Sequence, residues 1–194
     1  YPVGGNQVDF PISSGEGSKS AKFNGGAWAL RHTYTYGCYY PFSSDNFHIK
    51  MTELPVYYNG QKQTGDDNTD NLGAFDYMSA AAAVPDEDGE LSITMQHMGC
   101  FAMFLLTMPE ADSYTDMMLE SDDAGFVTEG TYDLSSDVPA ITPKTTSQTW
   151  KMELKNISTT SAGQTITVYA MFAPDNMKGS NVTIKVKGES GKTY

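Results

Sequence analysis

The chain has 194 residues, of which 24 are acidic and 12 are basic, and its isoelectric point is about 4.4. The resulting negative field repels the phosphates of nucleic acids and anionic lipid headgroups, so we expect neither as a partner. Apolar residues make up 39% of the chain and aromatic residues 12%, which is too much for a disordered acidic protein. The chain should therefore fold, with one large core or two modest ones.

Alternation of apolar and polar residues, the pattern of half-buried antiparallel strands, recurs along the whole chain. In chain order, we expect strands at residues 7–12, 28–42, 75–80, 90–97, 100–108, 113–119, 126–134, 149–155, 165–173 and 181–187. Clusters of Gly, Asp, Ser and Pro between them supply turns, and no stretch shows a sustained helical period. The pattern predicts an all-β protein with β-sandwich rather than α/β architecture.

Four of these strands have a predicted burial pattern. The run "CFAMFLLTM" at residues 100–108 is about half of the ~20 residues that a membrane helix needs, so we expect a buried strand. In the other three strands, period two predicts these inward sets: Leu91, Ile93 and Met95; Trp150, Met152 and Leu154; Val182, Ile184 and Val186.

A change of composition divides the chain near Asp88. The alanine run of "AAAAVPDEDGE" ends at Pro85 and an acidic turn, and the sequence changes there from Tyr- and Gly-rich to Met- and Thr-rich. We predict a first module at residues 1–88 and a second at residues 89–194. A single sandwich with a long hairpin turn at this point is the alternative.

The polar stretch "NGQKQTGDDNTDN" first resembles a calcium loop, because Asp66, Asn68 and Asp70 occupy alternate positions. However, Asn71 stands where the sharp-turn glycine should be, and Tyr77 stands where a bidentate Glu is needed. We therefore expect a solvated connection whose Asn, Gln and Asp side chains remain in water, and no functional metal site. Weak calcium binding is the alternative.

Catalytic and cofactor-binding motifs are absent from the sequence. It has no G-x-S-x-G elbow, G-x-G-x-x-G or P-loop, and the spacing of His32, His48 and His97 fits no metal motif. The carboxylates cluster in turns, where nothing raises their pKa for acid catalysis. We predict no enzyme, no catalytic residue and no cofactor, with a dispersed carboxylate pair of glycosidase type as the unsupported alternative.

The aromatic segment "TYTYGCYYPF" allows two interpretations. Tyr39 and Tyr40 could form a sugar-stacking platform, because a tyrosine offers a flat apolar face together with a hydroxyl. Alternatively, the rings form one packed face of a long strand, which would also contain Arg31 as an ordinary strand residue. Cys38 and Cys100 are expected as free thiols within strands, with a disulfide bridge as the alternative.

An ordered set of segments resembles the fimbrillin family of Gram-negative anaerobes. In chain order the set is "YYPFS", "LPVYYNGQKQTG", "NLGAFDYMSA", a strand ending at His97, "FAMFLLTMP", "FVTEGTYDLS" and "TVYAMFAP". The similar segments cover most of the chain from about Phe23 to Tyr194. Single segments are weak signals, whereas their common order is fairly specific.

The resemblance implies a non-enzymatic subunit of a cell-surface fimbria (pilus), or a cell-adhesion protein of the same build, without a cofactor. It implies two β-sandwich domains of transthyretin-like Greek-key topology, of which the first is incomplete in this chain. It further implies secretion as a lipoprotein precursor, location at the outer membrane, and assembly in which an extended strand of one subunit fills a groove of the next. The expected partners are other fimbrial subunits, or glycans and proteins of host or bacterial surfaces; a glycan-binding module using exposed Tyr and Trp is the alternative.

The C-terminal residues suggest an incomplete assembly unit. "TIKVK", "GESG" and "KTY" are typical of a strand, a hairpin turn and the first residues of a returning strand. Strand addition needs a free extended segment, and none follows Lys192, so we expect the isolated chain to be monomeric and the second domain to be truncated. Related precursors are often trimmed at arginine, but we expect Arg31 to escape cleavage inside its strand.

Overall fold

The structure is a computed structural model that describes residues 11–15, 20–24, 30–46, 49–123, 125–136, 140–174 and 180–194, with only the backbone at Ala81 and Ala82. All statements below refer to these residues. The strands are β1 (Ile12–Ser14), β2 (Lys22–Phe23), β3 (Tyr36–Tyr40), β4 (Leu54–Tyr57), β5 (Lys62–Thr64), β6 (Met78–Ala83), β7 (Gln96–His97), β8 (Cys100–Thr107), β9 (Ser113–Ser121), β10 (Phe126–Tyr132), β11 (Ile141–Ser147), β12 (Thr149–Ser158), β13 (Thr165–Phe172) and β14 (Val182–Gly188). The helical content of the described residues is three short 3-10 turns, at Ser44–Asn46, Met51–Glu53 and Leu72–Ala74.

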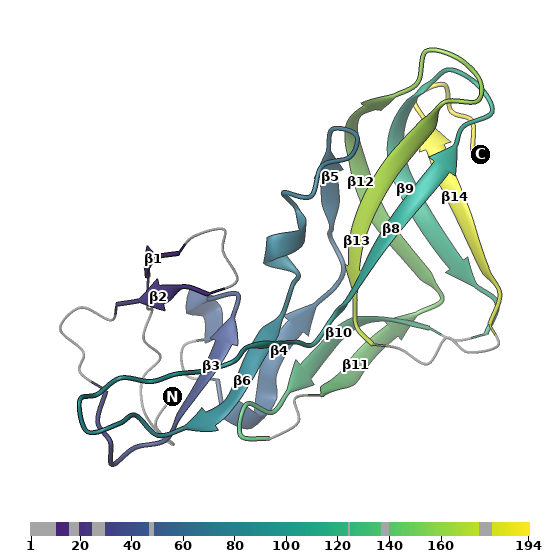
Figure 1. The fold of residues 1–194 in the computed structure, drawn as a ribbon. Helices are drawn as coiled ribbons and strands as arrows, with labels where there is room; N and C mark the ends of the chain where they lie inside the picture. The colour runs from purple at the N-terminus through teal and green to yellow at the C-terminus, as the bar shows by residue number, and fades with distance from the viewer. Residues whose placement is uncertain are drawn as a thin grey trace.

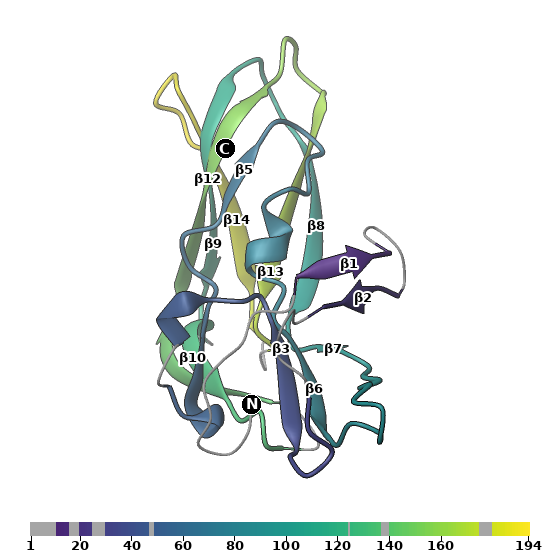
Figure 2. The ribbon, with the colours of Figure 1, turned by 90° about the vertical axis from the view of Figure 1, so that its left-hand side faces the viewer.

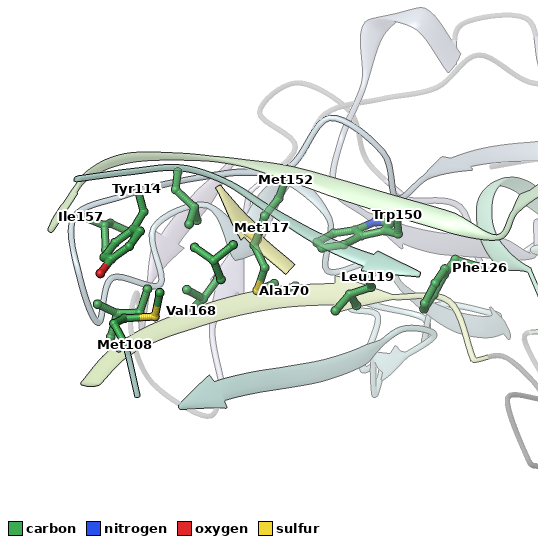
Figure 3. Packing of buried hydrophobic residues seen from close by; sticks show 13 residues of the cluster. Met108, Tyr114, Met117, Leu119, Phe126, Trp150, Met152, Ile157, Val168 and Ala170 are labelled. Carbon is green, nitrogen blue, oxygen red and sulfur yellow. The ribbon is translucent and has the colours of Figure 1, made fainter. Parts of the chain in front are cut away.

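A β-sandwich forms the upper part of the molecule in Figure 1. One layer is the sheet β14-β9-β12-β5, and the other is the antiparallel pair of β13 and β8. Between the layers lies a core of side chains from both, part of which is drawn in Figure 3. Trp150 is fully buried in this core, near Phe126 in Figure 3, and its ring centroid lies 4.7 Å from that of Phe172.

A second buried cluster lies where the sandwich meets the lower sheets, β11-β10-β4 and β3-β6-β7. Its buried members are Leu54, Val56, Tyr58, Tyr77, Met98, Val127, Tyr132, Leu134, Met171 and Ala173. Met171 lies at the end of β13 and Ala173 directly follows the strand, so this cluster continues from the sandwich core.

The prediction of an all-β sandwich is confirmed. Strands β9, β10 and β13 begin at Ser113, Phe126 and Thr165, where the alternation places them. The inward set of β12 is also confirmed, because Trp150, Met152 and Leu154 are all buried. One face of β12 meets the sandwich core and the other faces outward, which is the environment that strict alternation predicts.

The prediction of one long aromatic strand at residues 28–42 is wrong in its first part. The strand β3 begins only at Tyr36, and Arg31 lies before it in a turn-containing segment. The Tyr34 N–H donates to the Arg31 carbonyl over 3.0 Å, and the Arg31 N–H donates to the Tyr36 hydroxyl over 3.0 Å. These local bonds occupy backbone groups that a strand would use, so Arg31 is exposed in a turn and is not a strand residue. Trp28 lies outside the described residues.

Three further expectations about strands need correction. Of residues 90–97 only Gln96–His97 pairs as a strand, so Leu91, Ile93 and Met95 do not form a strand's inward face. The strand β8 is not buried on both faces, because Phe101, Met103 and Leu105 are 57%, 53% and 61% exposed. In β14, Val186 is buried whereas Val182 and Ile184 are exposed.

Hydrogen-bonded strand pairs cross the expected boundary near Asp88. The strand β4 pairs with β10 antiparallel, and β5 pairs with β12 parallel. The boundary between residues 1–88 and 89–194 stays a prediction, as does the Greek-key connectivity. The strand expected at residues 7–12 lies largely outside the described residues. Within them, β1 begins at Ile12. No helix in the described part is long and apolar enough to cross a bilayer.

Candidate functional site

The edge strand β8 is the most unusual surface of the sandwich. It pairs with β13 over its whole length, from Cys100 opposite Phe172 to Thr107 opposite Thr165. Within the described residues no strand pairs with its other edge. An unpaired strand edge offers backbone donors and acceptors to another chain.

The opposite edge of the pair, on β13, is closed by side chains instead of a strand. The Met171 N–H donates to Gln61 Oε1 over 2.9 Å, and Gln61 Nε2 donates back to the Met171 carbonyl over 2.6 Å. Two residues along, the Tyr169 N–H donates to Gln63 Oε1 over 2.7 Å, and Gln63 Nε2 donates to the Thr167 carbonyl over 2.8 Å. Each amide thus offers one acceptor and one donor, as a backbone peptide in a neighbouring strand would.

A carboxylate continues this row of side chains. Asp66 Oδ1 accepts the Thr167 N–H over 2.7 Å. The loop that delivers it turns at Gly65 and Asp67, whose φ angles are 89° and 53°. The row formed by Gln61, Gln63 and Asp66, which we call the side-chain edge, leaves β8 as the open edge of the pair.

The prediction that the polar stretch after β4 keeps its Asn, Gln and Asp side chains in water holds for Asp66, Asp67 and Asp70, which are exposed, and is wrong for its glutamines. Gln61 and Gln63 are 1% and 0% exposed. The carboxylates of Asp66 and Asp67 accept hydrogen bonds from β13 rather than facing a common centre, with Asp67 bonded to the Tyr169 hydroxyl. Among the described residues, no group of three His, Cys, Asp or Glu side chains could hold a metal ion.

Sequence reasoning missed the two glutamines, although a signal existed. They are two residues apart between Gly60 and Gly65, so they point to the same face of a short strand. A Gln-x-Gln spacing between two turns is compatible with an inward-facing amide pair. Polarity alone predicted that both glutamines face solvent, because an amide is buried only where its donors and acceptor find hydrogen-bond partners.

The side-chain edge also shows which backbone groups of β8 are unpaired. Thr167, Tyr169 and Met171 direct their N–H and C=O groups away from β8, toward the side-chain edge and Asn71, so they are the non-hydrogen-bonded partners of β8. Their register partners are residues 105, 103 and 101. In an antiparallel pair the backbone groups of such partners point away from each other. The N–H and C=O groups of these three β8 residues therefore face the open edge.

The same three residues carry the exposed apolar side chains of β8. Phe101, Met103 and Leu105 form a row on one face, which we call the apolar row. The Phe101 ring stacks on Tyr169 with centroids 5.6 Å apart and planes inclined by 20°. The Tyr169 hydroxyl donates a hydrogen bond to Asp67, which raises the pKa of the hydroxyl and anchors the ring beside Phe101. The row thus combines unpaired backbone with apolar contact area.

The two tyrosines predicted as a sugar platform lie on β3, away from this edge. Tyr39 is half-buried and packs against the second cluster, whereas the Tyr40 ring is exposed. Neighbouring strand residues point to opposite faces of the sheet, so Tyr39 and Tyr40 do not lie on one face, and a platform that uses Tyr40 would need a second ring from another residue. The platform stays a prediction.

The remaining candidate residues are scattered. Cys38 and Cys100 are free thiols, as expected, and burial raises the pKa of Cys38. His97 Nδ1 lies 2.7 Å from Asp76 Oδ1 in an exposed pair, and His32 is exposed in the turn before β3. His48 lies outside the described residues. The described structure does not bring the histidines and cysteines together into a metal-binding group.

The fold and its edge define an all-β sandwich protein with an open, apolar strand edge. A family model described as fimbrillin-like matches residues 6–194, and the chain belongs to this family. Among solved structures, it is similar to a Bacteroides uniformis protein whose cell-adhesion role is a provisional assignment, with 12% identity and a TM-score of 0.55. The match covers 94% of this chain and 68% of that one, and at this identity it shows the fold alone. No curated protein matches the sequence significantly.

Proposed function

We propose that the protein is a non-enzymatic subunit of a cell-surface fimbria, or an adhesin of the same build, that joins its neighbour by strand addition along β8. Membership of the fimbrillin-like family and the fold shared with the Bacteroides protein support a surface role. The proposal includes export as a lipoprotein precursor to the outer membrane, two Greek-key domains, and other fimbrial subunits as partners.

The open edge of β8 is the observation that carries this proposal. Strand addition takes its affinity from backbone hydrogen bonds and its register from alternate side chains. The backbone groups of Phe101, Met103 and Leu105 face the open edge, and their side chains form the apolar row. An incoming strand with apolar residues at alternate positions would satisfy both.

A double variant of the full-length protein, Met103→Lys with Leu105→Lys, tests the proposal. Both side chains are already more than half exposed, so stability should change little, while lysines on an edge oppose strand pairing. We expect normal secretion, loss of incorporation into fimbriae and loss of detergent-resistant ladders. The matched control is Val84→Lys, which charges an apolar residue of similar exposure (56%) away from the edge. Ladders of unchanged length in the double variant would show that assembly does not use β8.

Glycan binding is a second candidate function. Its supporting observation is that the aromatic segment exposes Tyr34, Tyr40 and Phe42 within nine residues. A glycan array would test it with wild-type protein and Tyr40→Ala, which removes the exposed ring but not the half-buried Tyr39. Sugar binding that disappears in the variant would support an adhesin with its own glycan site.

A further inference from the structure

One face of the protein has the opposite charge balance to the chain as a whole. The outward face of the sheet β14-β9-β12-β5, which we call the lysine face, carries Lys62, Lys151, Lys155, Lys185 and Lys187. It therefore holds five of the chain's 12 basic residues but only three of its 24 acidic ones, Asp116, Glu120 and Glu153. The lysines gather on this face because side chains alternate along a strand: each strand that buries its apolar residues points the charged residues between them outward.

Cross-strand register gathers these lysines around Met118. Lys151 of β12 and Lys185 of β14 are both register partners of Met118, and Lys187 is the partner of Asp116. Together with Thr193, these five residues line a hollow of about 230 Å³. The lining thus contains three ammonium groups and one carboxylate.

Three ion pairs use part of this positive charge. Lys151 Nζ lies 2.8 Å from Asp116 Oδ1. The other two pairs are Lys185 Nζ with Glu120 Oε2 at 2.6 Å and Lys62 Nζ with Glu153 Oε1 at 2.8 Å. Lys155 and Lys187 have no ion pair within the described residues.

Asp116 remains ionised on this face. Burial raises its pKa, but hydrogen bonds from Lys151 and Thr115 and the charge of Lys187 outweigh burial, so the pKa lies below its ordinary value. The face keeps an excess of lysine at neutral pH even with this carboxylate charged.

The structure also holds an acidic segment that its own fold leaves without basic partners. In the turn after β6, Asp86 Oδ1 accepts the Glu90 N–H over 2.7 Å, and the Gly89 N–H donates to the Asp86 carbonyl over 3.1 Å. The side chains of Glu87, Asp88 and Glu90 are exposed and have no ion pair among the described residues. We call these three residues the acidic turn.

The two charged surfaces lie at opposite ends of an elongated molecule. In Figure 1 the acidic turn belongs to the loop that follows β6 at the lower left, whereas β9, β12 and β14 are at the upper right. Figure 2 shows the same separation along the long axis. They are therefore placed to meet between molecules rather than within one.

We propose that the lysine face of one molecule binds the acidic turn of a second copy, head to tail. The contact is heterologous, so each molecule in a pair keeps one surface of the other kind free, and repetition builds a filament, or a ring where the rotation between subunits closes, rather than a closed dimer. Charge complementarity of this kind steers subunits and fixes their register more than it adds affinity. The contact is separate from the β8 edge and would align subunits that strand addition then holds.

Charge reversal on each surface tests this contact by sedimentation equilibrium at high protein concentration and low salt. The face variant is Lys155→Glu with Lys187→Glu, which breaks no ion pair, and the turn variant is Glu87→Lys with Asp88→Lys. Like charges then oppose each other, and we expect each variant alone to lose self-association by about tenfold or more. An equal mixture of the two variants should regain it, because each then offers the other a complementary surface at both contacts.

Two controls make the result specific to the lysine face. Lys22→Glu with Lys144→Glu changes the net charge equally at lysines elsewhere and should leave association intact. A neutral pair, Lys155→Gln with Lys187→Gln, should weaken association without adding repulsion, and it replaces the reversal if that variant unfolds. Raising the ionic strength from about 10 mM to about 150 mM shortens the Debye length from ~30 Å to ~8 Å and should weaken the wild-type contact.

The outcomes separate this inference from the proposed function. The measurement is repeated in the Met103→Lys, Leu105→Lys background, where the head-to-tail contact should persist even though strand addition is lost. Absence of salt-sensitive association in the wild type, or failure of the mixture to regain it, would overturn the inference. Binding of heparin, used as a polyanion probe, by wild-type protein that does not self-associate would assign the lysine face to anionic polysaccharide instead.

Discussion

At the scale of single residues, Gln61 and Gln63 show how a polar side chain can replace a strand. Both amides are buried, and each bonds to an N–H and a C=O of β13. Gln63 Nε2 also donates to the Gly65 carbonyl over 3.0 Å, which holds the following turn. Removing such an amide leaves buried backbone groups without partners, which costs more than the bond itself contributes.

We therefore expect Gln63→Met, which keeps the length of the side chain, to be strongly destabilising. Loss of the bonds to Thr167 and Tyr169 should lower the free energy of unfolding by about 2–4 kcal/mol. Urea denaturation followed by Trp fluorescence would measure it, with Gln96→Met on the exposed strand β7 as the control. Equal midpoints for the two variants would mean that water replaces the amide and that β13 needs no side-chain edge.

At the scale of elements, the chain end forms a hook against the start of β9. After Gly188 the chain turns back, and Tyr194 exchanges two backbone hydrogen bonds with Val186, of 2.9 and 3.0 Å. The predicted hairpin at the end of the sequence is thus present. Asp112 fastens it by accepting hydrogen bonds from the Tyr194 and Ser190 hydroxyls, and Gly188 is required there because a side chain would collide with the carboxylate.

The hook should loosen in acid. Hydrogen bonds from Ser190, then from Tyr194, hold the pKa of Asp112 below its ordinary value of 3.8. A lowered folded-state pKa means that the stabilisation is present above the unfolded pKa and is lost as the pH falls through the folded one. We expect the protection of the Tyr194 amide against exchange, taken relative to its intrinsic exchange rate at each pH, to fall below about pH 4. In Asp112→Asn the exchange should be faster at neutral pH and lack this acid step; an unchanged pH profile in the variant would assign the step to another group.

At the scale of the whole molecule, contacts that cross Asp88 join the early and late parts of the chain. Besides the pairs β4–β10 and β5–β12, the Trp150 Nε1–H donates to the Tyr58 carbonyl over 2.9 Å inside the core. The side-chain edge that closes β13 also comes from before residue 88. The sandwich formed after residue 88 therefore depends on residues that precede it.

A fragment of residues 89–194 should accordingly fail to fold independently. It lacks β5, the side-chain edge and the acceptor for Trp150, so we expect poor dispersion in its amide NMR spectrum and no cooperative melting. Adding residues 54–88 to the fragment as part of one chain should restore both. A well-dispersed spectrum from residues 89–194 alone would instead support an independent second domain that begins near Asp88.

Local alternation was sufficient to determine the all-β class and the orientation of β12. Alternate side chains of a strand point to opposite faces of the sheet, so a strict apolar–polar alternation shows which face meets the core. It could not determine the exposure of β8 or the burial of Gln61 and Gln63. The apolar row looks like any buried strand in sequence, and its side chains are exposed because they lie on the face of β8 opposite to Phe104 and Leu106, which pack on the core. The glutamines look like loop residues, and their burial follows from unpaired groups of β13 more than 100 residues away in sequence. Only the tertiary structure decides both features, because the residues that cover a sheet face or pair with a strand edge are distant in the chain.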